Sequence, residues 1–269
     1  MIRLVELELY SFCNRKCKWC PNSYIDRQSY CNYIDDNIIT DKLLPGLKEL
    51  NYSGYITFSR YNEPLAHADK LKEIGWLFKK ELPNCKLVTN TNGDYLTEEV
   101  LIKLPIDELT IMDYDNKGID WCKERLEKIN CVIDEIKNQY IYAHYGDIKI
   151  LYYADWTKHC IISNRGGNLP EYSTAVRTYP CTEPRYFIGI NYDGTVSPCC
   201  NIRNDSLDQK PYIYGDLHDM TLDEILNCEK RQRFIEECEK AIYSVDSPCY
   251  YCINKGGRYT REKGGIDYE

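Results

Sequence analysis

Short runs of alternating apolar and polar residues recur along the first 165 residues, and segments with helical spacing separate them. The first run carries Ile2, Leu4, Leu7 and Leu9, and its alternation predicts a buried strand over residues 2–10. Similar runs predict strands over residues 55–59, 86–89, 108–112, 148–153 and 161–163. Apolar residues at helical intervals predict helices over residues 36–50 and 67–80, and helical segments within 119–137.

This alternation of strands and helices predicts an α/β fold in which helices pack outside a parallel sheet. Thr97, followed by Glu98 and Glu99, is placed to cap one further helix. The six predicted units are fewer than the eight of a closed TIM barrel. Loops that follow the carboxyl ends of such strands converge, so we expect the chemistry of the protein there.

The pattern changes after residue 168, where Pro170, Pro180 and Pro184 interrupt the alternation. We therefore expect one domain over residues 1–168 and a second over residues 169–269. In the second part, two short apolar runs flank a turn at residues 191–194, which ends in Gly194 and is a strong hairpin signal. Thr221 and a glutamate three residues later form a capping box that predicts the start of a helix.

Composition narrows the range of partners and locations. The chain of 269 residues is long enough to bury a full core. Its net charge of −8 (34 basic minus 42 acidic residues) gives no general attraction to a phosphate backbone, which disfavours long nucleic acid as a partner. The chain lacks an apolar run of membrane-spanning length and a signal-peptide pattern, so we expect no membrane association and a cytoplasmic location. Fifteen cysteines in such a chain indicate metal binding or catalysis.

Three of these cysteines, Cys13, Cys17 and Cys20, follow the first predicted strand with the spacing C-x3-C-x2-C. Three thiolates are one ligand too few for a closed four-coordinate zinc site. They can instead hold a [4Fe–4S] cluster, whose fourth iron then stays open to a small molecule, because clusters that only carry electrons have four cysteine ligands. A structural zinc knuckle is the alternative interpretation.

With Trp19 before the last cysteine, this motif resembles the signature of the radical S-adenosylmethionine (SAM) superfamily. The resemblance implies that the open iron binds the amino and carboxylate groups of SAM. It also implies that cleavage of SAM gives a 5′-deoxyadenosyl radical, which removes a hydrogen atom from a substrate carbon. The implied fold is a partial (β/α)6 TIM-like barrel, consistent with the six predicted units.

The resemblance also implies SAM contacts at the ends of the predicted strands. The residues concerned are Trp19, Asn62, Glu63, Pro64, Asn90, Asn92 and Asp113. Glu63 and Pro64 resemble the end of the Gly-Gly-Glu-Pro motif that binds the amino group of SAM, although Tyr61 and Asn62 replace its glycines. Asn90 and Asn92 lie in a Thr-Asn-Gly turn, which also forms without any ligand. Asp113 is placed by fold analogy alone.

A second cysteine set resembles the carboxy-terminal SPASM and shorter twitch domains, which carry auxiliary iron–sulfur clusters. Its members are Cys181, Cys199, Cys249 and Cys252. A SPASM domain would have a further cysteine where Arg258 stands, so the twitch pattern implies one auxiliary [4Fe–4S] cluster. Cys200 is a rival for Cys199, and a four-cysteine zinc ribbon is the alternative to a cluster.

The layout is similar to that of twitch enzymes that dehydrogenate an aminocyclitol alcohol. Such chemistry removes a hydrogen atom and a proton from the substrate, and the oxidised auxiliary cluster accepts the second electron. Arg165 lies where the resemblance implies an arginine directed at the substrate, although an arginine paired with a surface carboxylate is the simpler role. We expect a small-molecule or peptide substrate and an electron donor such as flavodoxin or ferredoxin.

Three other functions stay open at this point. The first is maturation of a ribosomal peptide by cross-linking or by epimerisation, with Cys160 as a candidate hydrogen donor. The second is modification of a nucleoside or nucleotide. The third is a non-enzymatic iron–sulfur or zinc-stabilised protein, which would bind metal without cleaving SAM.

Overall fold

The computed structural model of the chain describes residues 1–160 and 162–254. Its strands are β1 (Leu4–Leu7), β2 (Tyr55–Thr57), β3 (Lys86–Thr91), β4 (Glu108–Met112), β5 (Val132–Lys137), β6 (Tyr140–Tyr145), β7 (Ile148–Tyr153), β8 (Phe187–Ile190), β9 (Thr195–Ser197) and β10 (Gly215–Asp216). Its helices are α1 (Leu44–Glu49), α2 (Ala68–Glu81), α3 (Glu98–Leu101), α4 (Ile119–Lys128), α5 (Trp156–His159), α6 (Glu183–Tyr186), α7 (Leu222–Asn227) and α8 (Glu229–Glu239). Two short 3-10 helices are η1 (Pro21–Ser23) and η3 (Leu207–Tyr212), and one π-helix is η2 (Ile38–Leu43).

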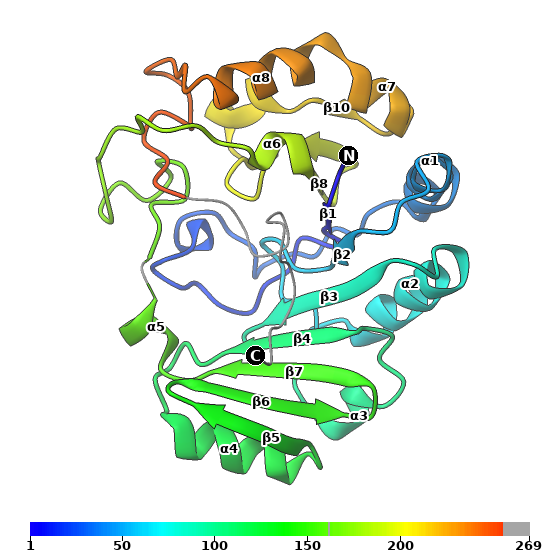
Figure 1. The fold of residues 1–269 in the computed structure, drawn as a ribbon, viewed down its shortest axis with the longest axis vertical. Helices are drawn as coiled ribbons and strands as arrows, with labels where there is room; N and C mark the ends of the chain where they lie inside the picture. The colour runs from blue at the N-terminus through cyan, green and yellow to red at the C-terminus, as the bar shows by residue number, and fades with distance from the viewer. Residues whose placement is uncertain (161, 255–269) are drawn as a thin grey trace.

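The described strands form one sheet in the order β10-β9-β8-β1-β2-β3-β4-β7-β6-β5. The six central strands, from β8 to β7, pair in parallel, and antiparallel strands extend the sheet at both edges. In Figure 1, α1 and α2 lie to the right of the sheet and the blue loop that follows β1 lies to its left. The open sheet with a parallel centre confirms the predicted α/β partial barrel.

The sixth parallel strand is β8, which was expected only as one arm of a hairpin. β8 pairs in parallel with β1, and all four of its residues are buried, as in strands covered on both faces. The strand predicted over residues 161–163 is wrong for residues 162 and 163, which are irregular, while residue 161 lies outside the described residues. The chain there turns through Arg165, Gly166 and Gly167, which all have positive φ angles and cannot continue a strand.

Residues 132–145 form a hairpin that the sequence analysis assigned in part to helix. α4 ends at Lys128, and β5 then pairs antiparallel with β6, which in turn pairs with β7. The connection is the two-residue loop of Asn138 and Gln139, and Asn138 has a φ of 55°. A left-handed Asn in a two-residue loop is a known hairpin signal. The β-branched residues of β5 and the alternating tyrosines of β6 therefore favour strands over a longer helix.

Several local predictions are confirmed. The Thr97 side chain accepts a hydrogen bond from the backbone N–H of Val100, and Thr221 forms the expected capping box with Glu224. The hairpin of β8 and β9 turns at residues 191–194, where Gly194 has a φ of 82°. The predicted helix over residues 36–50 forms as η2 followed directly by α1, and Pro45 lies at the start of α1, where the wider π-helical turns of η2 end.

One hydrophobic core joins both parts of the chain. Buried residues of the parallel sheet, such as Val5 and Ile56, belong to the same cluster as Ile188 in β8 and Ile225 in α7. The division at residue 168 stays a prediction, since β8 to β10 extend the same sheet.

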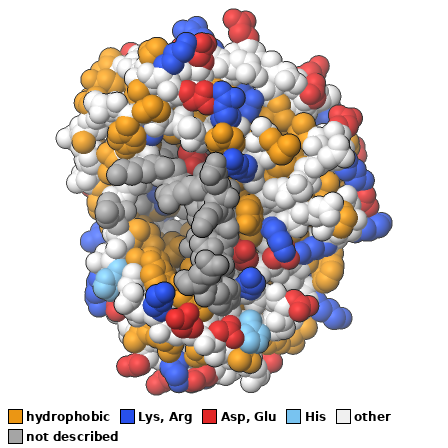
Figure 2. All heavy atoms as spheres, viewed as in Figure 1, with side chains coloured by type: hydrophobic (Ala, Val, Ile, Leu, Met, Phe, Trp, Pro, Cys, Tyr) orange, Lys and Arg blue, Asp and Glu red, His pale blue; other side chains and the backbone are white. Residues whose placement is uncertain are grey.

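The distribution of charged side chains on the surface agrees with the mixed charge of the sequence. Figure 2 shows Lys and Arg side chains interspersed with Asp and Glu over the described part of one face. Among the described residues, no helix is both long and apolar enough to cross a bilayer.

We predict that β8 contributes to global stability as a core strand. Replacing the fully buried Ile188 with Ala should lower the free energy of unfolding by about 2–5 kcal/mol, because it leaves a cavity between β1 and the hairpin. The same change at Ile136, which is 45% exposed on β5, should cost about 1 kcal/mol or less. Anaerobic urea titration followed by circular dichroism measures both values. Equal losses would show that β8 does not belong to the shared core.

Candidate active site

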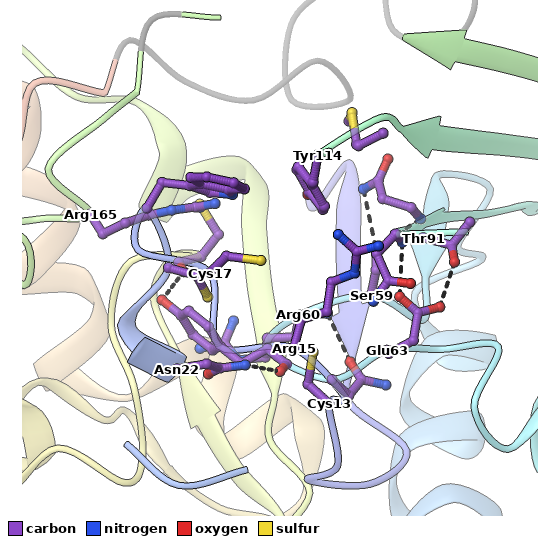
Figure 3. A pocket seen from close by; sticks show the side chains of 18 of the residues that line it. Cys13, Arg15, Cys17, Asn22, Ser59, Arg60, Glu63, Thr91, Tyr114 and Arg165 are labelled. Atoms are coloured by element: carbon purple, nitrogen blue, oxygen red, sulfur yellow. Dashed lines mark hydrogen bonds between the residues drawn. The ribbon is translucent and has the colours of Figure 1, made fainter. Parts of the chain in front are cut away.

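A cavity lies at the carboxyl ends of the parallel strands, where their loops meet. Its lining consists of Glu6, Cys13, Arg15, Cys17, Trp19, Cys20, Asn22, Ser59, Arg60, Tyr61, Asn62, Glu63, Asn90, Thr91, Asn92, Met112, Tyr114, Trp156, Arg165 and Cys200. The structure thus brings most of the predicted site residues to one place. Figure 3 shows Cys17 next to Arg165 on one side of this cavity, Glu63 with Thr91 on the other, and Arg60 between them.

The first cysteine loop presents all three of its thiols to the cavity. The loop follows β1 directly, and its start is fixed by a hydrogen bond from the Cys13 N–H to the carbonyl of Arg27 (2.9 Å). Burial raises the pKa of the Cys13 thiol to about 11 and that of Cys17 to about 12. Three partly buried thiols that line one cavity suit a soft metal centre, which binds thiolates and displaces their protons.

Glu63 lines the same cavity as the three cysteines and is held in place by the end of β3 and the loop after it. Its carboxylate accepts hydrogen bonds from the Thr91 hydroxyl, from the N–H of Asn92 (2.9 Å) and from the N–H of Leu65 (3.2 Å). Burial raises the pKa of Glu63 to about 7, and these donors partly oppose that rise. A buried carboxylate of this kind is suited to bind an ammonium group.

The predicted asparagines shape the turns around the cavity. Asn62 accepts a hydrogen bond from the N–H of Arg60 (3.0 Å) and donates one to the carbonyl of Phe58 (3.1 Å). Asn90 donates to the Ser59 hydroxyl (3.1 Å), and Asn92 donates to the side chain of Asn14 (2.8 Å). These contacts connect the ends of β2 and β3 to the cysteine loop.

Two predicted SAM contacts are not among the described residues that line the cavity, namely Pro64 and Asp113. The carboxylate of Asp113 is buried and accepts hydrogen bonds from the backbone N–H of Gly118 (3.2 Å) and of Asp155 (3.0 Å). It therefore connects the loop before α4 to the turn before α5. A contact between Asp113 and SAM stays a prediction.

Arg15 is a lining residue that the sequence analysis missed. Its guanidinium binds Asp94, in the loop after β3, through two nitrogens, and it binds Asp115, after β4, at 2.9 Å. Arg15 thus connects the cysteine loop to the next two loops of the sheet. Its position inside the cysteine motif was the one signal in the sequence that could have identified it.

Three aromatic side chains make up another part of the lining. The ring of Trp19 lies 5.5 Å from that of Tyr114 and 5.9 Å from that of Trp156, and the last two are 5.1 Å apart. Only Trp19 was singled out from the sequence. Tyr114 lies in the loop after β4 and Trp156 is the first residue of α5, so their proximity depends on the fold.

Arg165 enters the cavity from the turn that replaces the expected last strand. Its φ of 49° is followed by positive φ angles at Gly166 and Gly167, which let the backbone reverse there. In the part of the chain that the structure describes, no carboxylate forms an ion pair with Arg165, although its surroundings include Tyr61 and Tyr114. Pairing with a surface carboxylate, the simpler role, therefore has no support among the described residues.

The second cysteine set gathers beside the hairpin of β8 and β9. Cys199 is surrounded by Cys249 and Cys252, and Cys181 is close enough to both for electrostatic interaction. Burial raises the pKa of Cys199 far above its usual range, and the neighbouring thiols of Cys200, Cys249 and Cys252 add to that rise. Asn201 donates a hydrogen bond to the sulfur of Cys252 (3.6 Å). Four thiols in common surroundings suit an iron–sulfur cluster with four cysteine ligands.

Cys199 and Cys200 face different sites. Cys199 lies with the second cysteine set, whereas Cys200 lines the cavity of the first. A further buried thiol, Cys238 of α8, interacts with Cys249. The spacing of Cys238 in the sequence did not predict that it would lie near the second cysteine set. Among the described residues, no three His, Cys, Asp or Glu side chains converge as tightly as a single metal ion requires. We therefore infer both sets of cluster ligands from which cysteines lie near one another and from the chemistry of thiols.

Comparisons with known proteins agree with this architecture. Residues 181–253 match the family model of the SPASM domain, described as an iron–sulfur cluster-binding domain. The chain is 24% identical over 264 residues to the S-adenosyl-L-methionine-dependent 2-deoxy-scyllo-inosamine dehydrogenase of Niallia circulans, with 94% of each chain covered.

Solved structures resemble the whole chain. A crystal structure of BtrN in complex with AdoMet and 2-DOIA superposes with a TM-score of 0.74 at 21% identity, covering 98% of this chain and 97% of that one. A structure of anSMEcpe with bound AdoMet superposes with a TM-score of 0.53 at 14% identity, covering 89% and 84%. The chain therefore has the fold of these solved structures, and its residues 181–253 resemble a SPASM iron–sulfur cluster-binding domain. The resemblance to radical SAM enzymes of the twitch and SPASM group is confirmed.

The separate orientations of Cys199 and Cys200 predict different effects on metal content. Cys199→Ser should reduce the iron of the reconstituted protein from about eight to about four per chain, because one of two [4Fe–4S] clusters loses a ligand. Cys200→Ser is the matched control and should keep about eight. Iron and acid-labile sulfide analysis after anaerobic reconstitution measures both variants. The reverse pattern would assign the ligand role to Cys200.

If Glu63 binds the ammonium group of SAM, Glu63→Gln should weaken SAM binding by about 10- to 100-fold, because a charged hydrogen-bond acceptor becomes a neutral one. Equilibrium dialysis of labelled SAM against the reconstituted protein measures this change. Glu73→Gln, at an exposed position of α2, is the control and should bind SAM as the unmodified protein does. Equal affinities in all three proteins would exclude the contact.

Proposed function

We propose that this chain is a radical SAM oxidoreductase that oxidises a small hydroxylated substrate. Cys13, Cys17 and Cys20 hold a [4Fe–4S] cluster to which SAM binds. Cys181, Cys199, Cys249 and Cys252 hold an auxiliary [4Fe–4S] cluster. One observation carries the proposal: the three cysteines of the first loop share a single cavity with Glu63 at the carboxyl ends of the parallel strands.

When bound, SAM and the two clusters supply a 5′-deoxyadenosyl radical and an acceptor for one electron. The residues of the chain bind and orient the reactants. Glu63 binds the ammonium group of SAM, and the asparagines at positions 62, 90 and 92 fix the loops around it. Trp19, Tyr114 and Trp156 exclude water from one side of the cavity, and Arg165 donates hydrogen bonds to the substrate oxygen.

The substrate class that we propose is a small alcohol of the aminocyclitol type. Support comes from the relative named as a 2-deoxy-scyllo-inosamine dehydrogenase, which matches this chain along 94% of both lengths. The cavity also contains a cation, Arg165, and a carboxylate, Glu6, which suit contacts to the hydroxyl group of a substrate. A flavodoxin or ferredoxin as electron donor, and the cytoplasm as location, stay predictions.

The test is anaerobic reconstitution with iron and sulfide, followed by addition of SAM, dithionite and 2-deoxy-scyllo-inosamine. We expect about eight irons per chain, formation of 5′-deoxyadenosine, and a ketone product two hydrogens lighter than the substrate. Iron without SAM cleavage, or zinc alone, would contradict the proposal and leave a metal-stabilised binding or electron-carrying protein.

One observation favours a second candidate, epimerisation. The thiol of Cys200 lines the cavity, and a thiol can return a hydrogen atom to a substrate radical, whereas Cys160 is not among the described lining residues. The same reaction run in D2O separates the two functions. An epimerase would return the substrate with one solvent deuterium at the reacting carbon, and an oxidase would give the ketone.

A further inference from the structure

We propose that Glu6 is the catalytic base that takes the hydroxyl proton of the substrate during its oxidation. The inference rests on the proposed function, because only an alcohol oxidation requires this proton transfer. Glu6 lies on β1, and its side chain lines the cavity. The sequence analysis did not single out Glu6, which lies within the first predicted strand.

The balance of the reaction requires a base. The carbon-bound hydrogen leaves as an atom to the 5′-deoxyadenosyl radical, which becomes 5′-deoxyadenosine. The remaining substrate radical becomes a ketone when it loses the hydroxyl proton and one electron. The electron goes to the oxidised auxiliary cluster, and the proton goes to the Glu6 carboxylate.

The other cavity residues are poor proton acceptors. Arg15, Arg60 and Arg165 keep their protons in proteins, so an arginine can orient the substrate oxygen but cannot accept its proton. Burial raises the pKa of the Cys200 thiol far above neutrality, which keeps that group protonated as well. Glu63 is already engaged by three hydrogen-bond donors from its own loop and the next one.

Glu6 differs from Glu63 because one of its oxygens is available. Its Oε2 accepts a hydrogen bond from Nη1 of Arg60 (2.6 Å). Among residues 1–160 and 162–254, Oε1 has no hydrogen-bond partner. The carboxylate is therefore anchored on one side and free to accept a proton on the other.

The surrounding strands fix this arrangement. Glu6 is paired with Thr57 of β2 on one side and with Gly189 of β8 on the other. A Cβ atom at position 189 would lie only 2.4 Å from Nη1 of Arg60, so glycine leaves the space that the guanidinium occupies. Arg60 also donates from Nε to the side chain of Asn191 (2.8 Å), which holds its guanidinium beside Glu6.

The electrostatic surroundings suit a base. Burial raises the pKa of Glu6 to about 7, with Arg60 acting in the opposite direction. The other charged groups that act on it are Glu8, which raises the pKa, and Arg165, which lowers it. A base with a pKa close to the operating pH combines an available carboxylate with sufficient proton affinity.

The test compares Glu6→Gln with the unmodified holoenzyme, using 2-deoxy-scyllo-inosamine deuterated at the carbon that is oxidised. Glu6→Gln keeps the hydrogen bond to Arg60 but cannot accept a proton at neutral pH. We expect deuterium still to reach 5′-deoxyadenosine, while ketone formed per 5′-deoxyadenosine falls by about 100-fold or more. A substrate-centred organic radical should become detectable by electron paramagnetic resonance, and the dissociation constant of the substrate should change little.

Two further variants complete the design. Glu6→Asp retains a carboxylate and should restore part of the ketone yield, which a purely structural role would not predict. Glu73→Gln makes the same chemical change at an exposed position of α2 and should behave as the unmodified enzyme.

Two outcomes would overturn the inference. If Glu6→Gln raises KM for the substrate while ketone per 5′-deoxyadenosine stays unchanged, Glu6 binds the substrate amine and is not the base. If Glu6→Gln and Glu6→Asp both lose their iron, Glu6 has a structural role only. Absence of ketone from the unmodified holoenzyme would instead contradict the proposed function, so the two failures can be told apart.

Discussion

The parallel pairing of β1 with β2 on one side and β8 on the other is the constraint on which the site depends. It places the loop of the first three cysteines, the Glu63 turn and the turn after β8 at one end of the sheet. Residues separated by more than a hundred positions thereby contact each other, as in the hydrogen bond from Arg60 to Asn191. Because a parallel strand requires a long crossover connection, only the whole fold can create this proximity.

Buried ion pairs also connect the first cysteine loop to the segment after β9. Arg27 and Glu8 are fully buried partners, and Arg27 also pairs with Asp205 (2.7 Å). Arg203 binds Asp205 as well and donates a hydrogen bond to Asn22 next to the third cysteine (3.1 Å). Desolvation offsets much of the Coulomb attraction in such pairs, so their main effect is to fix one geometry. Here they hold the first cysteine loop against the segment after β9.

Structural features that depend on residues close together in the chain could be predicted from the sequence. Cysteine spacing, the turn at residues 191–194 and the caps at Thr97 and Thr221 are local signals, and the structure contains each of them. The parallel role of β8 could not be predicted, because its partner strand lies far away in the sequence. Glu6 and Arg60 were missed for the same reason, since a single polar residue in a strand carries no sign of what it will face.

The central claim is that the first cluster leaves one iron open and that SAM occupies it. Electron–nuclear double resonance on the reduced protein tests this directly, with SAM labelled by 15N at its amino group or by 17O at its carboxylate. We expect hyperfine coupling of both labelled nuclei, 15N and 17O, to the reduced cluster. This coupling should be lost when Cys17 is replaced by serine. A cluster that forms with no coupling from either label would contradict it.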